Sequence, residues 1–344
     1  MKSFEFSQSL PVLGLTFLLI IPVGHGCESL PCTDGNFTAA ETVPVKMTVH
    51  SKANMDGRSV DMLIFADGKT KYLECWQKVQ MPANGEVSIA SMNGEKILMA
   101  CSGMDSKDHG DWMWVSSIES LNDAWTELEA ETADMPVLSG SCSFLAGAPH
   151  NMQPMLTMRR VSCEVHLRSL RCDFKGKPYE GEKLSGIQVY LTNANASCRI
   201  WNDPGTASRI INQGRLVMED VARFKDPSLI WQKIEEDVGD IGTMPDIRLR
   251  CYPDSAQEEG PGTPFTRLVI EGILDENTWY WPIDINRDGE SSHQGLESNC
   301  VYTYDIVLTR KGSADPDTAI RTDEAAITME VEKWEEKKDY TVGF

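Results

Sequence analysis

The stretch ITMEVEKWEEKKDYTVGF, residues 327–344, decides the fold that we expect for this chain. Apolar and polar residues alternate through residues 327–331, as in a strand with one apolar and one solvent-facing side. The alternation slips by one residue at Lys333 and Trp334, which is typical of a β-bulge, and it resumes at residues 340–344. The spacing also allows a helix, but β-branched and aromatic residues favour a strand.

A terminal segment of this kind has two alternative uses. It can be an edge strand of its own sheet, or it can be donated to the sheet of a neighbouring molecule. In the second case, the donor residues are the apolar and aromatic ones: Ile327, Met329, Val331, Trp334, Tyr340, Val342 and Phe344.

Composition excludes one class of partner and indicates the fold class. The 344 residues include 32 basic and 52 acidic side chains, which gives a formal net charge of −20. We expect no nucleic-acid partner, because no basic surface is available to neutralise phosphates. Short runs of Val, Ile, Thr and aromatic residues between Gly, Pro, Asn and Asp indicate an all-β chain, and its length is enough for two domains.

The first 26 residues are typical of an export signal. Lys2 precedes an apolar run, residues 10–23, that is too short to span a bilayer as a helix. Gly26-Cys27 then matches a lipoprotein cleavage site loosely, so we expect Cys27 to be acylated, for example with palmitate, and to anchor the chain to the outer membrane. The alternative is an ordinary signal peptide with Cys27 free or bridged.

Ten cysteines are compatible with disulfides in an exported chain. Their spacings are wide and irregular and include no CxxC, so we expect no zinc site, and we expect no cofactor. Several of them lie in apolar runs, where a thiol also serves as a small buried hydrophobic group. The sequence does not define which cysteines pair.

Residues 27–155 are expected to form an N-terminal β-sandwich. Strands are predicted at residues 43–49, 60–65, 71–80, 86–90, 96–101 and 135–146, with Asp67-Gly68 as a hairpin turn. Leu121, Trp125 and Leu128 are spaced for one face of a helix over residues 116–131. In that helix Ser116 and Glu119 would form a capping box.

Residues 156–344 are expected to form a second β-sandwich with the terminal segment 327–344. Strands are predicted at residues 161–168, 187–191, 247–252, 266–273, 279–285 and 301–309. Asp226-Pro227 predicts the start of a helix that carries Ile230, Ile234 and Val238 on one face and ends at Gly239.

Several blocks of the sequence resemble one family. FTRLVIEG at residues 265–272, YWPIDINR at 280–287 and YTYDIVLTRKGSADPD at 302–317 resemble the C-terminal domain of fimbrillins, the type V pilus subunits of Bacteroidales. PVLSG at 136–140, RVSCEV at 160–165, VYLTN at 189–193 and the ending W…YTVGF are also similar. The order of these blocks carries the resemblance, which covers residues 40–344. The ten cysteines are more than the family leads us to expect.

The resemblance implies a fold and a function. It implies two tandem transthyretin-like β-sandwiches with a few short helices, exported as a lipoprotein. It also implies that a trypsin-like protease removes the first strand, and that the C-terminal strands of another subunit fill the resulting groove. The partners would then be other fimbrial subunits of a cell-surface fimbrium that serves adhesion.

Maturation by such a protease requires a basic residue between the first two predicted strands. No Lys or Arg lies between Cys27 and Lys46. Arg58 is our first candidate and Lys52 our second, because they flank the polar, turn-like residues 53–57.

Three other kinds of motif were compared with known ligand and catalytic sites, and each favours a structural role. Asp284, Asn286 and Asp288 match the start of a calcium loop, but its twelfth position is Gly295 instead of Glu, so a turn is favoured over a metal site. The pairs Trp112/Trp114 and Trp279/Trp281 would each share a strand face, which favours packing over a sugar site. The sequence has no HExxH, GxSxG or P-loop motif, and we expect no catalytic residues and no enzyme.

Two functions follow from the sequence. The first is a structural pilus subunit. The alternative is a surface-anchored β-sandwich lipoprotein that binds a glycan or a host ligand.

Overall fold

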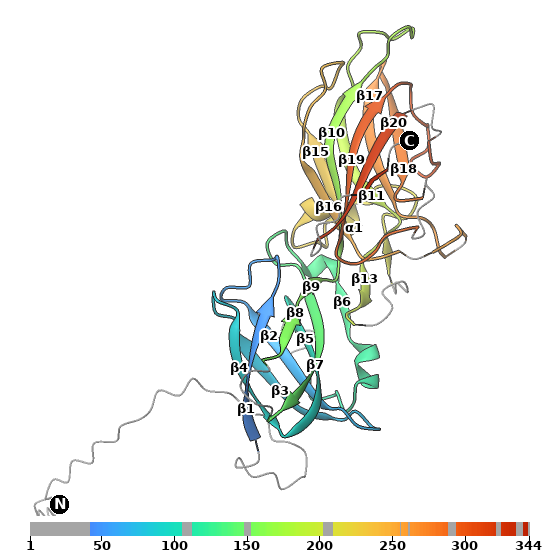
Figure 1. Cartoon of the computed structure of the whole chain (residues 1–344). Coiled ribbons are helices and arrows are strands. Elements are labelled where there is room, and N and C mark those ends of the chain that lie inside the picture. Colours follow the sequence, from blue (N-terminus) through green and yellow to red (C-terminus); the bar gives the residue numbers. More distant parts are fainter. Residues whose placement is uncertain are drawn as a thin grey trace, which may run out of the picture.

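The computed structural model describes residues 42–104, 112–147, 153–201, 209–254, 256–260, 262–287, 294–320, 325–334 and 340–342. The predicted export signal 1–26, Cys27, Asp288 and Phe344 lie outside these residues, as do the side chains of Tyr340 and Val342. The described chain is built almost entirely of strands, and two β units lie end to end in an elongated molecule (Figure 1). The expected all-β class is confirmed.

The first unit has two sheets. The smaller sheet has the order β4-β1-β8, with β4 at Glu86–Met92, β1 at Thr42–His50 and β8 at Met155–Thr157. The larger sheet has the order β3-β2-β5-β7-β9, and its strands are Leu73–Gln80, Ser59–Ala66, Gly94–Ser102, Leu138–Ala146 and Arg159–Arg160. β2 and β3 form the hairpin that Asp67-Gly68 predicts.

Alternation along the strands explains why these two sheets pack together. Met47 from β1 and Ile89 from β4 join Met62 and Ile64 from β2 in one buried apolar cluster. The intervening residue of β2, Leu63, points to the other face and belongs to a second cluster. β2 is therefore buried on both faces, and the segment after β5 covers the outer face of its sheet.

The second unit also has two sheets. The five-stranded sheet has the order β16-β10-β19-β20-β21, with strands Ile247–Cys251, Cys163–Cys172, Cys300–Leu308, Ala325–Lys333 and Tyr340–Val342. The four-stranded sheet has the order β15-β11-β17-β18, with strands Trp231–Ile234, Ser185–Thr192, Arg267–Leu274 and Asn277–Asp284. The central pair β10–β19 is parallel, a topology that requires a long crossover connection.

Buried side chains from both sheets of the second unit form its core. Tyr304 from β19, Leu167 from β10 and Ile270 from β17 are each at most 1% exposed. Short strand pairs complete the unit. β6 at Trp125–Glu127 pairs with β13 at Ser197–Arg199, and β12 at Ala194–Asn195 pairs with β14 at Ile210–Ile211. The β6–β13 pair connects the segment between β5 and β7 of the first unit to the second unit.

The helix predicted over residues 116–131 is wrong. The chain forms one 3₁₀ turn, η2 at Glu119–Asp123, then strand β6, and then a second turn, η3 at Leu128–Ala130. Leu121 and Leu128 are buried as their spacing suggests, but separate turns deliver them to the core. The predicted capping box is also wrong, because the N-cap of η2 is Ile118 and makes no side-chain cap bond.

The helix predicted to begin at Asp226-Pro227 lasts for a single turn. The cap itself is confirmed, because Asp226 Oδ1 accepts a hydrogen bond from the Ser228 amide at 3.2 Å. After η4 at Pro227–Leu229 the chain becomes strand β15, whose residue Ile234 pairs with Ile187 of β11. The only α-helix among the described residues is α1, at Met218–Val221.

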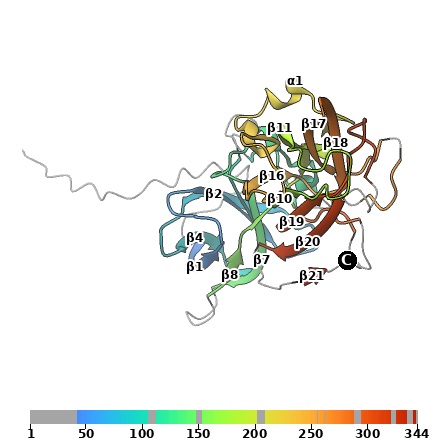
Figure 2. The same ribbon diagram turned by 90° about the horizontal axis from the view of Figure 1, so that it is seen from above.

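The terminal segment reverses direction where a bulge was predicted. β20 ends at Lys333, and β21 pairs with it in antiparallel fashion, Met329 with Val342 and Val331 with Tyr340. The slip in the alternation therefore marks a hairpin. Figure 2 shows β19, β20 and β21 following one another across the sheet.

Candidate functional site

β1 lies between two other strands in the small sheet of the first unit. It pairs with β4 in antiparallel fashion from Thr42 to Thr48 and with β8 in parallel fashion from Thr48 to His50. Further backbone bonds flank these ladders: the Val49 amide donates to Gly85 O at 2.8 Å, and the Met158 amide donates to His50 O at 2.8 Å. Without β1, both neighbouring strands would present unpaired backbone groups.

One face of β1 supplies part of the core of the first unit. Val45, Met47 and Val49 are 7%, 0% and 5% exposed. Lys46, between Val45 and Met47, and His50, after Val49, face solvent. Loss of β1 would uncover the apolar cluster that these three side chains close. The site is therefore a strand-shaped groove with two backbone edges and an apolar floor, and its occupant is at present the chain's own β1.

The two basic residues proposed for maturation differ in accessibility. Lys52 is exposed in the loop that follows β1. Arg58 is only 6% exposed, its Nη2 donates to Pro136 O at 2.7 Å, and burial lowers its pKa. A protease must hold the basic side chain in its own pocket, so this burial reverses our order of preference and favours Lys52.

The proposed donor residues lie in the second unit, on and after β20. All nine residues of β20 pair with β19, so the structure places this strand in its own sheet. Along its apolar face Met329 is buried at 5% exposed, whereas Ile327 and Val331 are half-buried. Trp334 follows β20 and is also half-buried. β20 is thus less completely buried in its own unit than β1 is in the first.

Polar contacts hold β20 in place. Glu330 accepts hydrogen bonds from Arg168 of β10, from Nη1 at 3.0 Å and from Nη2 at 3.1 Å. The same guanidinium binds Asp305 of β19, and these bonds lower the pKa of that carboxyl. Beyond β20, the Arg160 guanidinium lies 3.6 Å from the ring centre of Trp334. These contacts must break before β20 leaves its sheet.

β1 and β20 carry the same kinds of side chain in the same order. Each strand has nine residues. Aligned on Met47 and Met329, the inward positions pair as Val43 with Ala325, Val45 with Ile327, Met47 with Met329, and Val49 with Val331. A methionine flanked at two residues' distance by β-branched side chains therefore occurs on the buried face of both strands.

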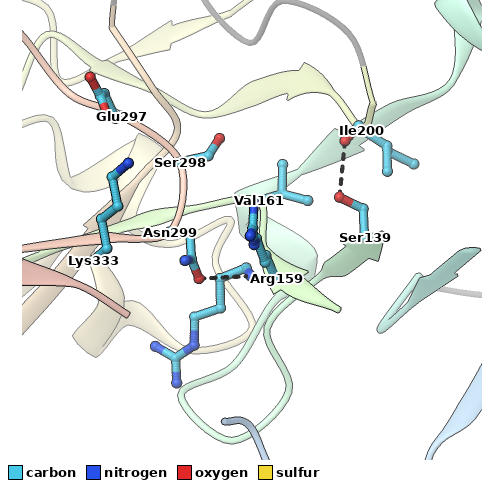
Figure 3. Close-up of a pocket in the computed structure, with 9 residues that line it drawn as sticks. Ser139, Arg159, Val161, Ile200, Glu297, Ser298, Asn299 and Lys333 are labelled. Carbon is cyan, nitrogen blue, oxygen red and sulfur yellow. Dashed lines mark hydrogen bonds between the residues drawn. The ribbon is translucent and has the colours of Figure 1, made fainter. Parts of the chain in front are cut away.

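A pocket of about 250 Å³ lies where the two units meet (Figure 3). Arg159 and Lys333 line it with Glu297, and the Ser139 hydroxyl in its wall donates to Ile200 O at 3.2 Å. No histidine occurs among the described residues that line the pocket.

A buried carboxyl connects the two units near this pocket. Glu131, in the segment between β5 and β7 of the first unit, is fully buried, and its Oε1 accepts a hydrogen bond from the Tyr252 hydroxyl of the second unit at 2.6 Å. Burial raises the pKa of Glu131 to about 7, although the Tyr252 hydrogen bond and the nearby cations Arg250 and Arg160 oppose this shift. Glu131 therefore titrates close to neutral pH.

The predicted tryptophan pairs do not form exposed platforms. Trp112 and Trp114 lie in a turn and not on one strand face. Trp112 is buried, Trp114 is 41% exposed, and their ring centroids are 6.0 Å apart. Trp279 and Trp281 do share a face of β18, but Trp281 is fully buried and donates to Arg310 O. This supports packing over a sugar site.

The residues of the calcium-like motif are used in other contacts. Asp284 accepts from Arg267 Nε at 2.7 Å, and the Asn286 side-chain amide donates to Gly295 O at 2.8 Å. Within the described part of the chain, no group of three or more metal-binding side chains comes together. The described residues also contain no helix with the length and apolar character required to cross a bilayer.

Solved structures share this fold. A fimbrilin from Porphyromonas gingivalis is 13% identical, with a TM-score of 0.60 over 85% of this chain and 97% of that chain. A candidate cell adhesion protein from Bacteroides eggerthii is 13% identical, with a TM-score of 0.64 over 87% and 98%. The C-terminally truncated tip fimbrial protein Mfa3 from P. gingivalis is 10% identical, with a TM-score of 0.51 over 85% and 99%.

The comparison confirms the two-sandwich fold that the sequence blocks lead us to expect. The match extends over nearly the whole of each solved chain. Searches with protein-family models and against curated protein sequences give no match.

Proposed function

We propose that this chain is a structural subunit of a cell-surface fimbrium, of the fimbrillin type, that polymerises by strand exchange. The observation that carries the proposal is a match between two strands of different sheets. β1 is the central strand of its sheet, and the C-terminal strand β20 has the same length and the same pattern of inward side chains. The shared fold with a fimbrilin and a tip fimbrial protein supports it. No catalytic step by this chain is part of the proposal.

Maturation begins with export and acylation at Cys27, which holds the chain at the outer membrane. A trypsin-like protease then cuts after Lys52, in the exposed loop between β1 and β2. The cut separates residues 27–52, including all of β1, from the rest of the first unit. The lipid anchor leaves with the same fragment, so cleavage both opens the groove and frees the subunit from the membrane.

A second copy of the chain then fills the groove with residues 327–344. Its Met329 takes the place of Met47, and Ile327 and Val331 take the places of Val45 and Val49. Each apolar side chain that becomes fully buried contributes roughly 1.5–3 kcal/mol, in addition to the restored ladders with β4 and β8. A shift of register by one residue would turn the whole apolar face to solvent, so pairing is specific.

Strand exchange buries more apolar surface of β20, but the contacts that hold β20 in its own sheet make its release slow. Ile327 and Val331 are half-buried in the second unit, whereas Val45 and Val49 at the matching positions of the groove are almost fully buried. Against this gain stand the nine pairs between β20 and β19 and the contact of Arg168 with Glu330. These contacts keep β20 in its own sheet, and the subunit monomeric, until the loss of β1 opens a groove in another subunit.

The experiment that tests the proposal is limited proteolysis of the purified chain followed by gel electrophoresis without boiling. We expect a ladder of detergent-resistant multimers and a new N-terminus at Ala53. Lys52→Gln should prevent the ladder, whereas Lys69→Gln, at another exposed loop lysine, should not. A chain that stays monomeric after release of β1 would contradict the proposal and favour the surface-anchored glycan- or host-ligand-binding lipoprotein.

A further inference from the structure

Two buried thiols face each other between edge strand β16 and its neighbour β10 in the five-stranded sheet of the second unit. Cys163 of β10 and Cys251 of β16 are direct partners in the antiparallel ladder, and their Sγ atoms are 3.4 Å apart. We propose that Cys163 and Cys251 form a disulfide in the exported chain. The proposal rests on export, which is part of the proposed function, because an oxidising compartment is required.

The geometry needs little change to make this bond. Directly opposite residues of an antiparallel pair have Cβ atoms about 4.5–5.5 Å apart or closer, near the spacing that a disulfide requires. A disulfide has a sulfur–sulfur length of about 2.05 Å, so the two sulfurs must approach by about 1.4 Å from their present separation. Small side-chain rotations supply that movement without breaking the β10–β16 ladder.

Two other cysteines compete for the same partner. Cys300 begins β19 and directly precedes Val301, which pairs with Glu164, so Cys300 lies beside Cys163 on the opposite edge of β10. Cys198 of β13 is also near Cys163, because burial and the neighbouring Glu131 and Cys163 together raise the pKa of the Cys198 thiol. Of these three cysteines, Cys251 is the direct ladder partner of Cys163, and its sulfur is in contact with the Cys163 sulfur. The geometry therefore selects Cys251 over Cys300 and Cys198.

The bond must form while the chain folds. Cys163 and Cys251 are 1% and 0% exposed, and burial raises the pKa of the Cys163 thiol, so the folded pair presents no reactive thiolate to solvent. Before β10 and β16 pair, a cysteine thiolate can attack a small-molecule or protein disulfide and form a mixed disulfide. The second cysteine then displaces the remaining thiol. Two thiols are oxidised and lose two protons, and one external disulfide is reduced to two thiols.

The bond would close a long loop. The two cysteines are 88 positions apart, so the link removes many conformations from the unfolded chain. It would also tie edge strand β16 to β10, the strand that enters the second unit from the first. We expect the link to stabilise the second unit without changing the groove of the first unit, which has separate strands.

Mass spectrometry tests the pairing. The full chain is reduced in denaturant, refolded with oxidised and reduced glutathione, and then unfolded and alkylated with N-ethylmaleimide before digestion. We expect a peptide containing Cys163 joined to one containing Cys251, with neither thiol alkylated. Alkylation of both cysteines, or a link from Cys163 to Cys300 or Cys198, would overturn the proposal.

Thermal unfolding with and without dithiothreitol provides an independent measurement. We expect the reductant to lower the melting temperature of the oxidised chain by roughly 5–15 °C. Cys251→Ala should abolish this difference, whereas Cys172→Ala, at a buried cysteine on the other end of β10, should retain it. An equal shift in both variants would contradict the assignment.

The same peptide map of chain isolated from the cell envelope tests the dependence on export. A Cys163–Cys251 link in the refolded chain that is missing from the envelope form would refute the bond in the cell. The multimer ladder of the proposed function is measured separately and does not depend on reductant. Failure of the disulfide and failure of polymerisation are therefore distinguishable.

Discussion

Arg168 of β10 reaches past β19 and holds Glu330 of β20, with Nη1–Oε2 and Nη2–Oε1 distances of 3.0 and 3.1 Å. The same guanidinium binds Asp305 of the strand in between. One cation therefore fastens three neighbouring strands, and β20 is the one that the proposed function requires to leave. The pair acts as a latch on the donor strand.

Loosening this latch should speed the opening of β20. Both side chains are more than one third exposed, so the ion pair contributes only about 0.2–1 kcal/mol. We expect Arg168→Gln to increase hydrogen exchange in the peptide of residues 325–333 by roughly 2–5-fold, measured by mass spectrometry. Lys311→Gln removes a different surface ion pair and should leave this peptide unchanged. Equal exchange in wild type and Arg168→Gln would show that β20 is held by its ladder alone.

Glu131 should make stability depend on pH. Its pKa is about 7 in the folded chain, above the ordinary value of 4.5, because burial disfavours the charged form. Between these two values the folded chain keeps a proton that the unfolded chain has lost. The free energy of unfolding should therefore fall as pH rises from 4.5 to 7, by at most about 3 kcal/mol, and this part of the pH dependence should be flat outside that window.

Glu131→Gln tests this prediction, because an amide keeps an acceptor for the Tyr252 hydroxyl and does not ionise. Denaturant unfolding across this pH window should show a flatter profile for the variant than for wild type. Glu127→Gln, at an exposed carboxylate in β6, should keep the wild-type profile. A wild-type slope in Glu131→Gln would assign the pH dependence to other groups.

Gly85 should be required for β1 to pack closely against the loop before β4. Its φ is +70°, and a Cβ there would lie 2.6 Å from Val49 O, next to the bond in which the Val49 amide donates to Gly85 O. Gly85→Ala should destabilise the chain by about 1–3 kcal/mol, measured by denaturant unfolding, and should speed the loss of β1 after proteolysis. Gly68→Ala has no atom within 4 Å of the new Cβ and serves as the control. Equal stabilities would refute the contact.

Much of the fold was predictable from the alternation of apolar residues. The predicted strands at residues 43–49, 60–65 and 301–309 correspond to β1 at Thr42–His50, β2 at Ser59–Ala66 and β19 at Cys300–Leu308. β1 and β19 each show an alternation of buried and more exposed residues, which period-two patterning reports directly, whereas β2 is buried on both faces and is found by its short apolar run. Strands of two or three residues, such as β8 and β9, are too short to carry a pattern and were missed.

The wrong helices share one cause. Residues 226–238 have a good cap and apolar residues at helical spacing, but pairing of Trp231–Ile234 with β11 replaces the helix after one turn. Residues 116–131 likewise form turns, from which Leu121 and Leu128 pack into the apolar cluster on the outer face of the sheet that contains β2. In both places tertiary packing overrides local preference. The spacing of apolar residues was correctly identified, and its structural interpretation was wrong.

The candidate site was only partly visible in the sequence. The donor-like segment and the first strand were found by their alternation, but the position of β1 between β4 and β8 depends on long-range pairing. The sequence also gave no sign that Arg58 is buried against Pro136 while Lys52 is exposed. A comparison of the two inward patterns around Met47 and Met329 would have revealed their match without the structure.

The central claim is that the C-terminal segment of one copy occupies the place of β1 in another. The measurement that tests it most directly is binding of a synthetic peptide of residues 325–344 to the chain from which β1 has been removed by proteolysis. Because the peptide is separate from the second unit, changes in it do not disturb the folding of that unit. We expect tight binding, a loss of more than 100-fold for the peptide with Met329→Asp, and a change of only a few fold for Thr328→Asp on the opposite face. No binding, or equal effects of the two substitutions, would contradict the account.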